Sequence, residues 1–168
     1  HSITEHTQTN WNGVVGRMEL RALATVGIAS IQVFPNAGVR TAIIETRLNN
    51  SLERQVLCRI DASALGMRKN TEVTLAPGSD SLATTVLDLG TDAPLWDEFY
   101  PRLIDLDVRI SARAGVADIT DARNVRFGLR DMGRNGPQFT LNGRPYSVRG
   151  TLECCIFPLT GYPAMDTG

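Results

Sequence analysis

An alternation of apolar and polar residues between Leu103 and Ala112 constrains the fold of this chain more than any other feature. Its apolar positions are Ile104, Leu106, Val108 and Ile110, and its polar positions are Asp105, Asp107, Arg109 and Ser111. Successive side chains of a β-strand point to opposite faces, so this period of two predicts a strand with one face in the core and one in water. Asp105 and Asp107 are therefore interpreted as part of a solvated sheet face rather than as a catalytic acid pair.

The same alternation recurs in short segments, which predicts strands rather than helices. Residues 125–130 and 56–61 show it, the second less cleanly because Leu57 interrupts the polar positions. Further strands are predicted at 18–24, 28–34, 39–48, 71–76 and 82–89. Turn-forming residues lie between these segments, and no segment carries a helical stripe. The predicted fold class is all-β, an immunoglobulin-like antiparallel β-sandwich with short flanking segments, and a closed barrel is the alternative.

Beyond Gly136-Pro137 the pattern changes to a C-terminal β-hairpin. Two short apolar segments, 139–141 and 144–148, flank Asn142-Gly143, a pair that readily adopts the positive φ angles of a type I′ turn. After Gly150 the periodicity is lost. We therefore expect residues 1–17 to end a preceding unit, residues 18–131 to form the sandwich, and residues 132–168 to hold the hairpin and the start of a truncated further unit.

Length and charge narrow the classes of partner. A chain of 168 residues is expected to hold one core. With 17 Lys and Arg against 18 Asp and Glu, it has no field that would recruit nucleic acid or an anionic membrane surface. No apolar run has membrane-spanning length, and residues 1–6 do not resemble a signal peptide. The compartment is left open, and a periplasmic or secreted parent is one expectation.

The cysteines and histidines argue against a disulfide framework and against a metal site. Three cysteines cannot all pair within one chain, and Cys154 and Cys155 are neighbours, for which a mutual disulfide would be strained. Both histidines of the chain lie within residues 1–6, away from the predicted strands. No metal and no cofactor is therefore expected, and Cys154 and Cys155 are interpreted as small apolar packing residues.

Four segments at the boundaries of the predicted sandwich carry a resemblance to a known family. They are Asn10-Trp11-Asn12-Gly13 with Met18-Glu19-Leu20, Leu95-Trp96-Asp97 with Pro101-Arg102-Leu103, Arg126-Phe127-Gly128-Leu129-Arg130, and Phe139-Thr140-Leu141-Asn142-Gly143-Arg144-Pro145 with Val148-Arg149-Gly150. In this order they resemble glycoside hydrolase family 2, which contains β-galactosidases, β-glucuronidases and β-mannosidases. Residues 20–90 add little beyond their strand pattern.

The resemblance implies a place for each part of the chain. Residues 1–17 would be the end of a sugar-binding jelly-roll domain, residues 18–131 the immunoglobulin-like domain, and residues 132–168 the hairpin and start of a (β/α)8 catalytic barrel. The two catalytic glutamates of the family would lie further downstream, so no catalytic residue is expected here. The chain would be a non-catalytic spacer of a parent that hydrolyses O-glycosidic bonds, with carbohydrate bound through that parent and with the adjacent sugar-binding and barrel domains as partners.

Substrate contact is expected from this chain only within an intact parent, at Glu153 and Cys154. Many family members continue after Arg-Gly with Val-Asn-Arg-His-Glu, whereas this chain has Thr151-Leu152-Glu153-Cys154-Cys155. A thiol at the histidine position argues against galactosidase-like specificity. The plainer interpretation of Glu153 is a charge on a loop or in an ion pair.

Two other functions are considered. An independent carbohydrate-binding or adhesion module would use Trp96, Phe99 and Tyr100 as a platform for a sugar ring. Their position beside Pro94 and Pro101 favours packing between the sheets or against a neighbouring domain instead. A self-contained enzyme is the least supported, because no nucleophile, base and orienting group are evident together.

Overall fold

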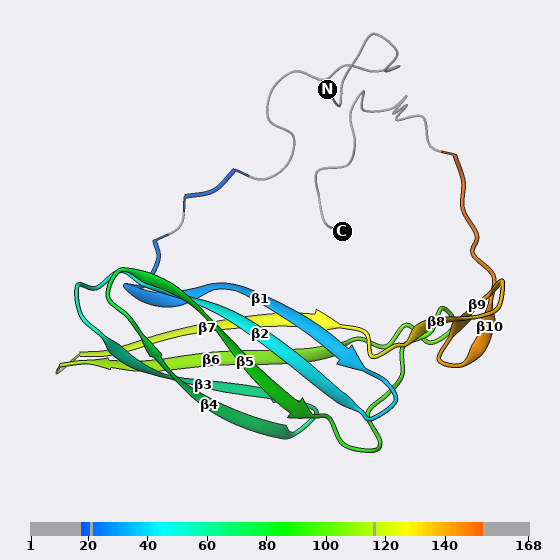
Figure 1. Ribbon diagram of the computed structural model, residues 1–168, viewed down its shortest axis with the longest axis horizontal. Coiled ribbons are helices and arrows are strands. Elements are labelled where there is room, and N and C mark those ends of the chain that lie inside the picture. Colours follow the sequence, from blue (N-terminus) through cyan, green and yellow to red (C-terminus); the bar gives the residue numbers. More distant parts are fainter. Residues whose placement is uncertain (1–17, 21, 116, 153–168) are drawn as a thin grey trace, which may run out of the picture. The chain divides into compact units, whose positions relative to one another are not determined.

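The fold is described from a computed structural model, which covers residues 18–20, 22–115 and 117–152 (Figure 1). In that part of the chain there are ten β-strands and no helix. The strands are β1 (Val26–Asn36), β2 (Thr41–Asn50), β3 (Val56–Ala64), β4 (Met67–Leu75), β5 (Ser79–Asp88), β6 (Ile104–Ala114), β7 (Ala117–Phe127), β8 (Met132–Asn135), β9 (Gln138–Leu141) and β10 (Arg144–Tyr146). Accordingly, the described residues contain no helix of the length and apolar character needed to cross a membrane.

Seven strands form two antiparallel sheets that face each other (Figure 1). One sheet has the order β1-β2-β5 and the other has the order β4-β3-β6-β7. In immunoglobulin lettering the first corresponds to strands A, B and E, and the second contains C, F and G. The fourth strand, β4, joins the C, F and G side, whereas a constant-type domain places its extra strand beside E. The predicted all-β antiparallel sandwich is confirmed.

The core lies between the two sheets and is built from the inward positions of the alternating strands. Ile44 of β2, Ile60 of β3 and Val108 of β6 are all fully buried. Each such side chain stabilises the fold by roughly 1.5–3 kcal/mol relative to exposure. Cys58 belongs to the same layer, and desolvation raises the pKa of its thiol to about 11, so it remains an unreactive packing residue.

The predicted strand at 18–24 is wrong for the residues that the structure describes. Met18, Leu20 and Leu23 are 78%, 102% and 70% exposed and belong to no strand. Apolar and polar residues alternate there, as in a strand. In the described chain, however, these residues have no neighbouring strand against which one face could be buried. Alternation is a signal of burial only where a second layer is present.

The last sandwich strand also differs from its prediction. β7 runs over Ala117–Phe127, and residues 128–130 leave the sheet. Its first half was missed because its inward positions include Asp121 and Arg123, which break the apolar pattern. The Asp121 carboxylate accepts a hydrogen bond of 2.9 Å from Ile28 N, and Arg123 Nη2 donates one of 3.3 Å to Ile28 O.

These two side chains close one edge of the sandwich. β1 pairs with β2 alone, so its other edge has no strand beside it in the same sheet. The register of the β1–β2 pair shifts between Ile28 and Ser30. β7 is the terminal strand of the opposite sheet. By bonding both the N–H and the C=O of Ile28, β7 satisfies peptide groups that would otherwise face solvent or another chain.

The other edge is joined between β4 and β5. Thr85 Oγ1 of β5 donates a 2.8 Å hydrogen bond to Thr71 Oγ1 of β4, and Thr85 is only 2% exposed. Near the same edge Asn50, also 2% exposed, donates from Nδ2 to Arg54 O and Ala76 O at 2.9 Å each. Its Oδ1 accepts from Leu52 N at 3.1 Å. The buried Asn50 amide thus bonds to the backbone of two loops, the one after β2 and the one after β4.

The C-terminal hairpin is confirmed and gains a third strand. β9 and β10 are joined by Asn142 and Gly143, whose φ angles are +50° and +77°, as a type I′ turn requires. β8 pairs with the other side of β9, in the order β10-β9-β8. Residues 23–147 form one compact unit, so the small sheet and the sandwich belong together.

Asn50→Ala is expected to lower the free energy of unfolding by about 1–3 kcal/mol, because it leaves the part-buried carbonyl groups of Arg54 and Ala76 without their partner. Urea unfolding followed by circular dichroism measures the change. Asn70→Ala, on an exposed position of β4, is the matched control and should stay within about 0.5 kcal/mol of the parent chain. Equal effects of the two substitutions would contradict the role assigned to Asn50.

Candidate functional site

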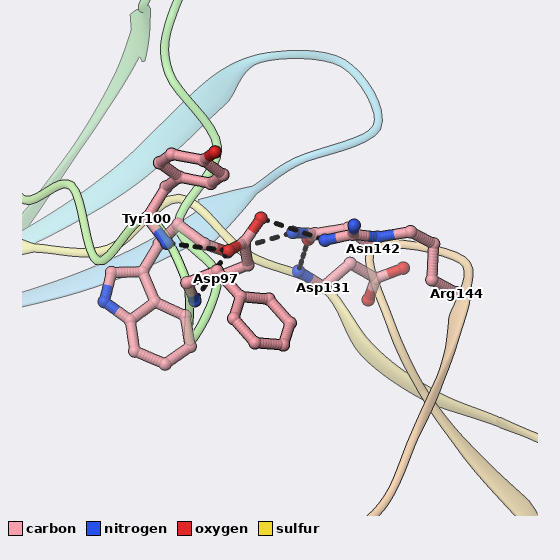
Figure 2. Close-up of polar contacts among 7 residues, drawn as sticks. Asp97, Tyr100, Asp131, Asn142 and Arg144 are labelled. Atoms are coloured by element: carbon pink, nitrogen blue, oxygen red, sulfur yellow. Dashed lines mark hydrogen bonds and ion pairs between the residues drawn. The ribbon is translucent and has the colours of Figure 1, made fainter.

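Three segments far apart in the sequence meet where the small sheet joins the sandwich (Figure 2). They are residues 95–100 between β5 and β6, residues 128–131 between β7 and β8, and residues 142–144 at the hairpin turn. We call these residues the junction. The junction contains three of the four motifs singled out in the sequence, although nothing in the sequence indicated that they touch.

Trp96 lies against the strand exit at Gly128. Its backbone N–H donates a 2.9 Å hydrogen bond to Leu129 O. A Cβ atom added to Gly128 would lie 2.9 Å from Trp96 Cγ, so only glycine allows the indole to approach this closely. The Arg130 guanidinium lies 4.5 Å from the centroid of the Trp96 ring, a cation–π contact that holds both side chains in place.

Asp97 organises the following turn and reaches across to the hairpin. Its Oδ1 accepts hydrogen bonds from Phe99 N at 2.9 Å and Tyr100 N at 2.8 Å, and its Oδ2 accepts one from Arg144 Nη2 at 2.9 Å. The bond from Tyr100 contributes most to holding the pKa of this carboxyl below its ordinary value, and the bonds from Phe99 and Arg144 add to it. Asp97 is therefore ionised at neutral pH, and its side chain is only 14% exposed.

Asn142 connects all three segments. Its backbone N–H donates to Asp131 O at 2.8 Å, and its Oδ1 accepts from Asp131 N at 2.9 Å. Its Nδ2 donates to Trp96 O at 2.9 Å. Asparagine is among the few residues that tolerate the positive φ of the turn, so one residue both forms the hairpin and joins it to the sandwich (Figure 2).

These contacts make the junction a structural clamp. The oxygens of Asp97 and the amide of Asn142 are bonded to backbone or to Arg144, so they are not free to accept or donate a proton in a reaction. No group of three or more metal-ligating side chains occurs in the described part of the chain. The arrangement can hold one segment against another, and it places no activated nucleophile.

The sequence-predicted contact residues Glu153 and Cys154 lie outside the described residues, as do Trp11 and Cys155. Their roles stay predictions. Asp105 and Asp107 are exposed on the outer face of β6, as expected for a solvated face, and Asp107 accepts a 3.1 Å hydrogen bond from Asn124.

The three aromatic residues between β5 and β6 differ in exposure. Trp96 is half-buried in the junction, whereas Phe99 and Tyr100 are 74% and 68% exposed. Packing between the sheets is therefore wrong for Phe99 and Tyr100. Contact with a neighbouring domain stays a prediction for both.

Sequence reasoning missed the residues that hold the junction together. Asp97, Asn142 and Arg144 were quoted only as parts of motifs, and Asp131 was not singled out. Asn142-Gly143 was the one usable signal, since it located the turn. The contacts of Asn142 with Trp96 and Asp131 span 46 and 11 positions, a separation at which local patterning carries no information.

Solved structures of carbohydrate-acting enzymes share this fold. The exo-chitosanase CsxA of Amycolatopsis orientalis matches 77% of this chain at 23% identity and a TM-score of 0.60, over 16% of its own length. A GH2 β-galacturonidase from Eisenbergiella tayi matches 73% at 19% identity and a TM-score of 0.58, over 21% of its length. A β-glucuronidase from Bacteroides uniformis matches 75% at 18% identity and a TM-score of 0.59, over 17% of its length.

The chain thus spans between 16% and 21% of the length of the enzymes it matches. The resemblance to glycoside hydrolase family 2 is confirmed at the level of the fold. No protein-family model matches the chain, and no curated protein sequence matches it.

Gly128→Ala is expected to destabilise the chain by about 1–3 kcal/mol, because the new methyl group would overlap the Trp96 indole. Chemical denaturation measures the loss. At Gly150 an added Cβ meets no atom within 4 Å, so Gly150→Ala is the matched control. A double-mutant cycle with Trp96→Leu should give less than the sum of the single effects, and strict additivity would exclude the overlap as the cause.

Asp97→Asn is expected to destabilise the chain at pH 7 and progressively less at acid pH. The pKa of Asp97 is lower in the folded chain than its unfolded value of about 3.9, so the stabilisation is present above that value and is lost as the pH falls through the folded pKa. Urea unfolding of both chains at pH 7 and at a series of lower values measures this. Asp80→Asn, at an exposed position of β5, is the control. A difference between Asp97→Asn and the parent chain that did not change with pH would contradict the assignment.

Proposed function

We propose that this chain is a non-catalytic spacer domain of a larger, family 2-like glycoside hydrolase, and that the junction sets the direction in which the polypeptide leaves the sandwich. The parent enzyme would hydrolyse O-glycosidic bonds in carbohydrate. Glu153 and Cys154 would contact sugar only within that parent. The adjacent partners would be a sugar-binding domain before the sandwich and a catalytic barrel after the hairpin.

The junction is the observation that carries this proposal. A spacer has to transmit a fixed orientation from one end to the other. Asn142 bonds to Asp131 and to Trp96, and Arg144 bonds to Asp97, so the hairpin is attached at two points by charged or amide groups. A hairpin attached in this way cannot swing freely about residues 128–131. The hairpin is therefore held in one position against the sandwich.

The share of the solved enzymes that the chain matches supports the same reading. Between 73% and 77% of this chain superimposes on a part that makes up only 16% to 21% of each enzyme. That relation is expected of one domain within a multidomain protein. The enzymes are named for acting on carbohydrates, which supports a carbohydrate-acting parent.

The chemistry of glycoside hydrolysis also favours a catalytic centre elsewhere in the parent. Retaining enzymes need two carboxyl groups about 5 Å apart, one of them able to give up a proton near neutral pH. Asp97 is unsuited to either role, since its oxygens are occupied by Phe99, Tyr100 and Arg144. A spacer needs neither group.

An independent carbohydrate-binding module is the second candidate, and the exposure of Phe99 and Tyr100 favours it. The Phe99 ring lines a small hollow of about 100 Å³, formed also by Glu98, Leu141 and Tyr146 among others, and could stack on a sugar. The spacer is preferred because the same two rings would also serve as the apolar centre of a contact with a neighbouring domain.

The purified chain is expected to show no hydrolysis of chromogenic β-galactosides, β-glucuronides or β-glucosaminides above a blank without protein, because the catalytic carboxyls are proposed to lie elsewhere in the larger enzyme. Release of the chromophore over hours at several pH values provides the measurement. Glu153→Ala is assayed in parallel. Turnover by the unsubstituted 168-residue chain that disappears in Glu153→Ala would overturn the non-catalytic assignment.

A further inference from the structure

A groove of about 600 Å³ opens at the edge of the sandwich near the junction. Residues 33–35 of β1 line one side, and Arg126 and Phe127 of β7 with Gly128 after it line the other; Leu103, Arg130 and Met132 complete the lining. β1 and β7 run along the same edge of the sandwich (Figure 1). The groove lies outside the clamp formed by Asp97 and Asn142, although Arg130 contributes to both.

The path of the two strands explains why a groove forms here. At Ile28 the strands are held together by Asp121 and Arg123. In the described sheets β1 pairs with β2 alone and β7 with β6 alone, so each strand has an open edge facing the other. Toward Phe34 and Phe127 residues of both terminal strands line the groove.

The side chains of the groove combine positive charge with exposed apolar surface. Among the described residues that line it, the ionisable ones are Arg126 and Arg130, and both are exposed. Phe34, Leu103 and Met132 are 48%, 51% and 52% exposed. A guanidinium presents a planar set of donors that matches a carboxylate in a bidentate arrangement. Arg130 is already oriented by its contact with Trp96, which lowers the entropic cost of binding.

We propose that this groove binds a carboxylate-bearing saccharide, namely a hexuronate unit of an acidic glycan. The carboxylate would lie between Arg126 and Arg130, the C–H face of the ring would pack on Phe34 and Leu103, and hydroxyl groups would bond to the open peptide edges. The volume falls within the roughly 300–1,000 Å³ of small-ligand sites. The choice of a carboxylate follows from the two arginines, and the choice of a saccharide rests on the proposed carbohydrate function.

An acidic peptide added as an extra strand fits the groove less well. Strand addition depends on a continuous row of backbone donors and acceptors. Each wall of the groove offers only a short stretch of edge, residues 33–35 and 126–128, and Pro35 has no N–H to donate. A sugar acid needs fewer backbone bonds, because the guanidinium groups supply the main recognition.

The test is a titration of the isotopically labelled chain with digalacturonate, followed by amide resonances. We expect saturable shifts for residues around Phe34, Phe127 and Met132, and no shifts with the neutral digalactoside at equal concentration. Arg126→Gln should weaken binding about tenfold or more, as loss of a charged hydrogen bond implies. Arg68→Gln, exposed on β4 at the far side of the same sheet, should bind as the parent chain does.

Three results would overturn the proposal. They are no saturable shift with digalacturonate, equal affinity of Arg126→Gln and the parent chain, and binding of glutarate or an acidic tetrapeptide at least as tight as that of the sugar acid. The last result would assign the groove to carboxylates or peptides in general. Arg126→Gln must first unfold at the same urea concentration as the parent chain, and Arg126→Lys, which keeps the charge but not the planar donors, serves as the second variant. If digalacturonate does not bind, the expected lack of glycosidase turnover is unaffected, so the two proposals are tested separately.

Discussion

Neither of the two sheets of the sandwich can bury its apolar face alone, and each has two terminal strands with an unpaired edge. The sandwich solves both problems at once, because the strands that end one sheet lie beside the strands that end its partner. Asp121 and Arg123 bond to Ile28 on one side, and Thr85 bonds to Thr71 on the other. These bonds join the two sheets on both sides of the apolar layer that contains Ile44 and Val108.

The same device operates at the junction, where polar side chains satisfy backbone groups of segments that belong to different elements. Asn142 bonds to backbone groups of Asp131 and Trp96. These loop residues have no strand ladder, so Asn142 supplies hydrogen bonds that a ladder would otherwise provide. Between β1 and β7 there is no ladder either; side chains join the two strands at Ile28, and further along residues of both strands line the groove beside Arg126. The clamp and the groove therefore both lie where segments of different sheets meet without a ladder between them.

Local patterning predicted the elements that are covered on one face and missed those whose environment is set by distant residues. β6 was predicted from its alternation because all its inward positions carry apolar residues of the core. The first half of β7 was missed because Asp121 faces inward to bond with β1. The apparent strand at 18–24 has the right pattern but no covering layer in the described chain. At the site, the Asn142 turn was predicted, whereas its contact with Trp96 was not.

The sequence by itself determined that the chain is all-β with a type I′ hairpin, since alternation and the Asn-Gly pair act over a few residues, and it favoured a sandwich over a closed barrel. It also located the motifs that resemble glycoside hydrolase family 2. Only the tertiary structure decided that Trp96, Gly128 and Asn142 form one clamp, and that Arg126 and Arg130 share a groove. Such contacts depend on how two sheets pack and where their edges diverge, and these are properties of the assembled layers rather than of any single segment.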